Sequence, residues 1–205
     1  MKVSLFLDFW NFSLTLKRYD VAYRPDWYKI ADVFSTEAGK ILKAKLELQD
    51  FNIFGSYSKS DADKKLRGWV NSYLPKIPGA NVQFYERRQK TKGPICPVCH
   101  TEVKNCPQTE CGASMLGTEE KCIDTLIATT MLQDAWQKKY DVAILVSGDK
   151  DFIPAVEFLK NQGVKTIHAQ FGHEGMELSN KCWGRFNILR ITNNFKLSKT
   201  ILKNR

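Results

Sequence analysis

The stretch VAILVSGDKDF, from Val142 to Phe152, joins a run of five apolar residues to a short acidic turn. The apolar run has no polar alternation, which is typical of a central parallel strand buried on both faces of its sheet. Similar short runs, rich in β-branched or aromatic residues, stand at 3–7, 51–57, 82–85 and 164–169. The sequence therefore predicts a sheet that contains these five strands.

Helical patterns lie between the apolar runs. Apolar residues recur at helical spacing over 61–74 and 119–136, and a third pattern over 152–162 has Pro154 in its first turn and ends at Gly163. Strands that alternate with helices predict a doubly wound α/β fold with a mainly parallel sheet. We expect one such domain over 1–90 and 115–191, an insertion over 91–114, and a closing amphipathic helix over 192–205.

The overall charge is basic: 31 Lys and Arg against 22 Asp and Glu give a net charge of +9. Nucleic acid is a common partner of basic domains, although charge alone fits an ordinary basic enzyme equally well. Asp8 and Asn11 interrupt the first apolar run, and no run is long enough to span a bilayer. We therefore predict a cytoplasmic protein with no membrane partner.

Acidic residues stand where parallel strands of an open α/β sheet would end. Asp8 closes the first apolar run, Asp149 and Asp151 follow the run at 142–146, and Asp124 lies in the helix predicted over 119–136. Each has a simpler interpretation. Asp149 or Asp151 fits a helix N-cap, Asp8 fits an ordinary turn residue, and Asp124 fits a solvent-facing helix position.

Taken together, these carboxylates predict a metal site. Four carboxylates in one cleft repel one another and need a cation to stay ionised. Oxygen ligands of this kind suit Mg²⁺ or Mn²⁺, which can activate water for phosphodiester hydrolysis. Asn11 and Ser147 are neutral, so we expect them to orient the carboxylates or a phosphate by hydrogen bonding.

Three motifs resemble those of NYN domains, a branch of the PIN-like nucleases. Asp8 and Asn11 match the family's D-x-x-N, 147–152 matches S-G-D-x-D-F, and 121–124 is similar to K-G-x-D, with Cys122 in place of glycine. The resemblance covers residues 1–170 apart from the insertion. It implies a three-layer α/β/α PIN-like fold and a metal-dependent nuclease acting mainly on RNA. It also implies that Asp8, Asp124, Asp149 and Asp151 form the acidic site, with Asn11 beside them.

The insertion carries four closely spaced cysteines: Cys96, Cys99, Cys106 and Cys111. Two Cys pairs at this spacing predict a tetrahedral Cys₄ zinc site, which would fold a segment too short to fold by burial alone. A redox disulfide is the alternative. Cys122 and Cys182 stand apart, and we interpret them as buried thiols rather than ligands.

Basic residues lead into the insertion. Arg87, Arg88, Lys90 and Lys92 predict a phosphate track beside an acidic site, and a solvated charged face is the alternative. Trp10, between Asp8 and Asn11, fits either base stacking or packing on the next helix. Lys121, from the K-G-x-D-like motif, joins the predicted nucleic-acid-binding set.

The function that fits these features is a metal-dependent endoribonuclease. Its expected substrate is RNA, single-stranded or in structured loops, with single-stranded DNA as a second candidate and a homodimer left open. The alternative function is a non-catalytic nucleic-acid-binding module that uses the basic face and the zinc ribbon. A phosphatase is disfavoured because the usual nucleophile loops are missing and the net charge favours a polymer over a small metabolite.

Overall fold

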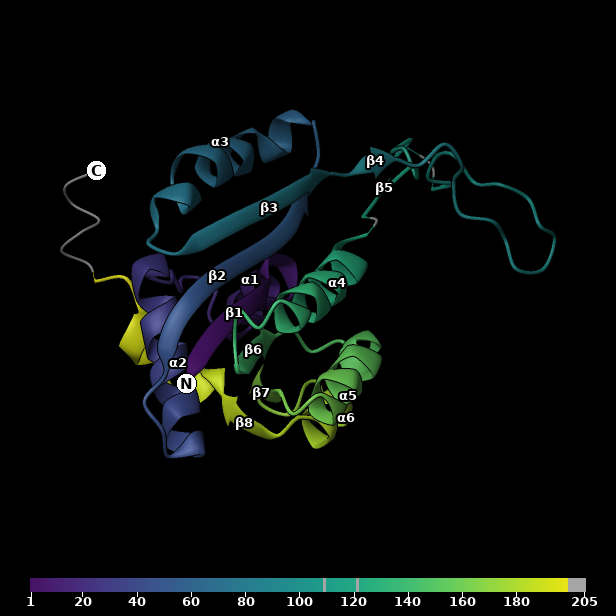
Figure 1. The fold of residues 1–205 in the computed structure, drawn as a ribbon. Coiled ribbons are helices and arrows are strands. Elements are labelled where there is room, and N and C mark those ends of the chain that lie inside the picture. The colour runs from purple at the N-terminus through teal and green to yellow at the C-terminus, as the bar shows by residue number, and fades with distance from the viewer. Residues whose placement is uncertain (109, 121, 199–205) are drawn as a thin grey trace.

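The centre of the fold is a six-stranded sheet with the order β3-β2-β1-β6-β7-β8 (Figure 1). The computed structural model describes residues 1–108, 110–120 and 122–198. All neighbouring strands of this sheet run parallel. The strands are β1 (Lys2–Asp8), β2 (Glu47–Tyr57), β3 (Ala80–Glu86), β6 (Val142–Val146), β7 (Lys165–Gln170) and β8 (Gly184–Asn187).

Helices cover both faces of the sheet. They are α1 (Phe9–Tyr19), α2 (Trp27–Leu42), α3 (Lys64–Ser72), α4 (Ile123–Trp136), α5 (Ile153–Asn161) and α6 (Met176–Lys181). Side chains of α1, α2 and α3 share one hydrophobic cluster with the sheet, and side chains of α4, α5 and α6 share another. The predicted α/β/α layering is confirmed. Within the described residues, no helix is both long and apolar enough to cross a bilayer.

The central strands are buried because their side chains alternate between the two apolar layers. In β1, Leu5 and Leu7 belong to the cluster with α1 and α2, whereas Phe6 belongs to the cluster with α4. Every residue of β6 is fully buried, as the unbroken apolar run predicts. The polar residues that follow these strands therefore stand at the rim of a rigid core.

Several elements differ from the sequence prediction. Strand β8 and helices α1, α2 and α6 were not predicted. The helix expected over 61–74 is split into a 3₁₀ turn (Asp61–Asp63), α3 and a second 3₁₀ turn (Leu74–Lys76). The helix expected from 119 begins at Ile123, because Thr118–Glu119 forms strand β5 instead. Helix α5 has Pro154 in its first turn and Gly163, at φ +78°, just beyond its end, as predicted.

The insertion leaves the sheet as an arm. Strands β4 (Arg88–Gln89) and β5 pair antiparallel at its base, and the chain between them projects away from the domain (Figure 1). The predicted insertion, 91–114, lies within this arm. At the C-terminus, Thr192–Phe195 forms a 3₁₀ turn, and Lys196 bridges to Pro25. The start of the predicted C-terminal helix is thus not α-helical, and residues 199–205 lie outside the described residues.

Candidate active site

The ends of β1 and β6 meet at one edge of the sheet, because Leu7 pairs with Val146 in parallel register. Asp8 is the last residue of β1, and the turn that contains Ser147, Asp149 and Asp151 directly follows β6. Two segments far apart in sequence thereby place carboxylates on the same edge. Open α/β sheets commonly bind ligands at this edge, just beyond the carboxyl ends of their strands.

Asp8 is held in one orientation and is nearly buried. It is the N-cap of α1: its Oδ1 accepts hydrogen bonds from the backbone N–H groups of Trp10 and Asn11, both at 3.0 Å. Its Oδ2 lies 3.4 Å from the Ser147 hydroxyl. Burial raises the pKa of Asp8 to about 6; the Asn11 N–H partly offsets this rise, and the charges of Asp124 and Glu120 add to it. Asp8 is therefore both a capping residue and part of a charged cluster.

Hydrogen bonds hold the turn after β6 against α1. Asn11 Oδ1 accepts from the Gly148 N–H at 3.1 Å, and the Ser147 hydroxyl oxygen accepts from the Asp149 N–H at 3.3 Å. Asp149 Oδ1 accepts from the Asp151 N–H at 2.9 Å, so Asp149 caps the following 3₁₀ turn. Asn11 and Ser147 thus hydrogen-bond to the turn that carries Asp149, and their role toward a metal or a phosphate stays a prediction.

His168 of β7 and Gly175 at the N-cap of α6 pack against the same turn. The Ser147 carbonyl oxygen lies 2.7 Å from Nε2 of the fully buried His168. Burial lowers the pKa of His168 to about 4, so the ring is neutral at pH 7. Gly175, at φ +72°, packs so closely that a Cβ there would stand 2.9 Å from Gly148 Cα. The turn therefore has little room to move.

Asp124 reaches the same site from the first turn of α4. Partial burial raises its pKa, and the negative charges of Asp149 and Asp151 raise it further. Asp151 itself is exposed on the 3₁₀ turn. The structure therefore brings all four predicted aspartates into one electrostatic neighbourhood.

An open groove of about 830 Å³ runs over this neighbourhood. Its lining includes Asp8, Asn11, Asp124 and Asp149, whereas Asp151 stands outside it. As the described side chains are placed, no three His, Cys, Asp or Glu residues are close enough together to hold a metal ion. The groove thus collects carboxylates around an open space instead of packing them into a closed cage.

The sequence model of the NYN domain family matches residues 2–189, which include every element of this groove. The chain belongs to the NYN domain family. NYN domains are generally nucleases of the PIN-like type, and a nuclease domain implies a nucleic-acid substrate. The predicted family is thereby confirmed.

The fold of this NYN domain is also similar to a solved structure. VPA0982, a protein of unknown function from Vibrio parahaemolyticus, superimposes with a TM-score of 0.53 over 96% of each chain, at 15% sequence identity. At this identity the similarity concerns the fold alone. No curated protein matches the chain in sequence.

Glu120 is a further acidic residue of the NYN groove, and it was not predicted from the sequence. It accepts a hydrogen bond from the Ser56 hydroxyl and pairs with Arg87, 3.6 Å away. Burial raises the pKa of Glu120, Arg87 opposes that rise, and Asp124 adds to it. Its one sequence signal is its position, four residues before Asp124 at the foot of the insertion. The contacts of Glu120 with Ser56 and Arg87 join the end of the insertion to β2 and to the end of β3. No local sequence pattern predicts them.

Arg87 and Trp10 form one border of the groove. The Arg87 guanidinium carbon lies 4.6 Å from the centroid of the Trp10 ring, and its Nε donates to the Ser56 hydroxyl at 2.7 Å. Trp10 packs edge-on against Phe9 and also lines the groove, so both of its predicted roles remain available. The groove is further lined by Lys17 and Arg18 of α1, which were not predicted from the sequence.

The other predicted basic residues extend away from the groove. Arg88 is exposed in β4, and Lys90 and Lys92 are exposed where the arm begins. Because β3 is parallel to β2, this run leaves the sheet on the same edge as Asp8. Lys121 lies outside the described residues.

The cysteines of the arm form two pairs instead of one group of four. Hydrogen bonding with Thr101, and then with the Cys96 thiol, lowers the pKa of Cys99 to about 7. The Ala113 N–H, and then Cys106, lowers the pKa of Cys111. All four thiols are free, and no three of the described metal-ligating side chains of the arm stand close enough together to hold an ion. The zinc site stays a prediction.

The two remaining cysteines differ from each other. Cys182 is half-buried, and burial raises the pKa of its thiol to about 12, which fits the predicted buried thiol. Cys122 is exposed, so that prediction was wrong for this residue. It precedes α4 with φ +71°, a left-handed conformation that favours glycine. This conformation explains why the family motif has glycine at the position that Cys122 occupies.

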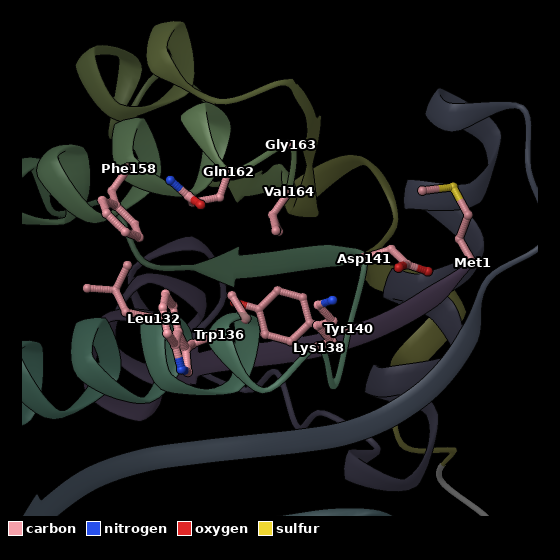
Figure 2. A pocket seen from close by; sticks show the side chains of 11 residues that line it. Met1, Leu132, Trp136, Lys138, Tyr140, Asp141, Phe158, Gln162, Gly163 and Val164 are labelled. Carbon is pink, nitrogen blue, oxygen red and sulfur yellow. The ribbon is translucent and has the colours of Figure 1, made fainter.

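A second hollow, of about 630 Å³, lies at the opposite edge of the sheet (Figure 2). It opens between α4 and α5, and apolar side chains such as Leu132, Trp136 and Phe158 line it. Its charged lining residues are Lys138 and Asp141. None of the predicted site residues lines this hollow, so the acidic groove remains the candidate active site.

Proposed function

We propose that this NYN domain is a metal-dependent endoribonuclease that hydrolyses phosphodiester bonds in RNA. The observation that supports this most is the meeting of Asp8, Asp124 and Asp149 at one groove, where burial and the charges of neighbouring carboxylates raise the pKa of Asp8 and Asp124. Carboxylates held together at such an electrostatic cost favour the binding of a cation.

The donor chemistry of the groove fits Mg²⁺ or Mn²⁺. Asp8, Asp124, Asp149 and Asp151 are the residues that would hold the ion. The backbone N–H bonds of Asp8 and Asp149 occupy Oδ1 in each case, so the Oδ2 atoms would be the ligand atoms. For Asp8, a bound ion would share Oδ2 with the Ser147 hydroxyl, which lies 3.4 Å away. A bound ion of this kind activates a water molecule and stabilises the leaving oxygen in phosphodiester hydrolysis.

The neighbouring residues would position the RNA. Asn11 and Ser147 keep the carboxylate-bearing turn in place, and Arg87, held by Ser56 and Glu120, offers its remaining N–H groups to a phosphate. Trp10, which lines the groove, would stack against an unpaired base, which favours single-stranded RNA or loops. Single-stranded DNA would satisfy the same contacts, and we place the activity in the cytoplasm.

The arm would add a zinc-stabilised surface for the RNA. Four thiols in two close pairs supply the donors of a Cys₄ site, and the lowered pKa of Cys99 favours the thiolate that zinc binds. A non-catalytic nucleic-acid-binding module is the second candidate function. It is favoured by one observation, namely that the described side chains do not form a ready-made metal cage.

One experiment separates these two functions. Labelled single-stranded RNA is incubated with the protein in Mn²⁺, in Mg²⁺ and in EDTA. We expect cleavage that depends on the metal, and loss of that cleavage in Asp149→Asn, a nearly isosteric change that keeps the fold. Asp32→Asn, which changes an exposed aspartate of α2, is the matched control and should cleave normally. Wild-type cleavage by a folded Asp149→Asn protein would refute the site, and RNA binding without any cleavage would favour the binding module.

A further inference from the structure

A second polar cavity lies on the same edge of the sheet as the acidic groove. It has a volume of about 550 Å³, and its lining includes residues at the carboxyl ends of β7 and β8. Its charged and amide lining residues are Glu37, Gln170, His173, Arg185, Asn187 and Arg190. None of these residues belongs to the motifs that mark the acidic site.

The amide oxygens of this cavity already have hydrogen-bond donors. Gln170 Oε1 accepts from the Ser179 hydroxyl at 2.6 Å, and Gln170 Nε2 donates to the Gly172 carbonyl at 2.7 Å. Asn187 Oδ1 accepts from the N–H groups of Gly172 and Leu189. The carboxylate of Glu37 is paired with Lys40 at 2.7 Å, which offsets its negative charge.

The donor groups of the cavity, in contrast, are available. The Arg190 side chain forms no hydrogen bond or ion pair with any described residue. The side-chain NH₂ group of Asn187 has no hydrogen-bond partner among the described residues either. Arg185 makes one contact to Asn180 Oδ1, at 3.3 Å, and a longer one to the Met176 sulfur. A cavity that offers donors and two guanidinium groups fits an anion that only accepts hydrogen bonds, and a phosphodiester is such an anion.

The strand order connects this cavity to the groove. β6, which carries Asp149, and β8, which ends at Asn187, are separated by β7 alone. Two steps between neighbouring strands span about 10 Å, which an oligonucleotide can bridge and a single phosphate cannot. An ion pair also joins the two hollows: Arg18 lines the groove, and its partner Glu174, 3.0 Å away, follows His173 of the cavity.

We propose that this cavity, through Arg185, Arg190 and Asn187, binds a backbone phosphate of the same RNA strand that enters the acidic groove. The proposal rests on the proposed function for the identity of the polymer. It gives the RNA a path along the sheet edge, from Arg87 beside β3, across the aspartates, to Arg190 beyond β8. The domain would therefore act on strands several nucleotides long and bind very short ones poorly.

The test measures binding of a single-stranded RNA decamer in EDTA, where no cleavage can occur. We expect the double variant Arg185→Ala/Arg190→Ala to flatten the log–log salt dependence of Kd by about 0.7 for each phosphate that the variant no longer neutralises. Lys160→Ala, which removes an exposed cation of α5, should leave the slope unchanged. Arg190→Lys should preserve most of the wild-type slope. An unchanged slope in a double variant that melts like the wild type would overturn the proposal.

A second measurement locates the phosphate. Each phosphate of the decamer is replaced in turn by a neutral methylphosphonate. At least one replacement should weaken binding to the wild type and have no effect on binding to the double variant. Identical position profiles for the two proteins would also overturn the proposal.

Failure of the proposed function gives a different result. If the wild type never cleaves RNA with Mn²⁺ or Mg²⁺ but the double variant still has a flatter slope, the nuclease assignment is refuted and the phosphate site is supported. If the wild type cleaves RNA and the double variant keeps the wild-type slope, the phosphate site is refuted and the nuclease assignment is supported. A protein that does not bind RNA at all refutes the cavity.

Discussion

At the scale of single residues, Asp8 couples stability to pH. Its folded pKa of about 6 exceeds the ordinary aspartate value of 3.8. The folded state therefore holds this proton more tightly than the unfolded state, and the metal-free protein should lose stability as the pH rises from about 4 to about 6. The loss can reach about 3 kcal/mol. Urea denaturation of wild type and Asp8→Asn at pH 4 and pH 7 measures it.

The asparagine variant is the informative comparison, because its side-chain oxygen can still cap α1 while it carries no titrating group. We expect its stability to vary less between the two pH values than that of the wild type. A metal ion needs the ionised carboxylate, so the apparent metal affinity of the wild type should rise over the same pH range. Equal pH dependence in the two proteins would show that Asp8 has an ordinary pKa.

Cys122 is a residue whose side chain conflicts with its backbone. Its left-handed conformation, at φ +71°, costs a non-glycine residue roughly 1–2 kcal/mol, and glycine avoids this cost but loses more entropy on folding. Cys122→Gly should therefore raise the free energy of unfolding by about 0.5–1 kcal/mol. Urea denaturation tests this, with Cys122→Ala as the control that removes the thiol but keeps the Cβ. A gain in the alanine variant would point to the thiol instead of the backbone.

At the scale of elements, the exit from β3 decides where the basic run lies. Since β3 is parallel to β2, Arg87 and Arg88 leave on the edge of the aspartates. Replacing both with Ala should flatten the salt dependence of RNA binding by about 1–1.5 log–log units if both contact phosphates. Cleavage at saturating RNA should change much less. If the double variant keeps the wild-type slope, the basic run that contains Arg87 and Arg88 is a solvated charged face.

The elements also show what the sequence could and could not predict. β6 and its acidic turn were predicted because an unbroken apolar run and a following turn are local signals. β8 was missed because its sequence, GRFN, is short and half polar, and its place beside β7 depends on tertiary packing. Glu120 was missed for a similar reason: its partners Ser56 and Arg87 come from other elements. Local chemistry is visible in the sequence, whereas contacts between distant segments are not.

At the scale of the whole molecule, the arm is joined to the domain only through the short β4–β5 pair and the contacts at its foot, as far as the described residues extend. Metal analysis should find about one zinc per chain. Cys99→Ser should release it and increase hydrogen exchange over 91–114, while the sheet keeps its melting temperature. A zinc-free protein whose four cysteines form disulfides would contradict the zinc site and support the redox alternative.

The position of β1 has a consequence for synthesis on the ribosome. β1 is made first, yet it lies between β2 and β6, and Asp8 and Ser147 are separated by 139 positions in the chain. A nascent chain that has not yet exposed β6 lacks the turn with Asp149 and the neighbour that fixes Asp8. A chain that stops between β2 and β6 therefore carries only part of the acidic site. The nucleic acid beside the emerging chain meets no finished groove until the turn after β6 has been made.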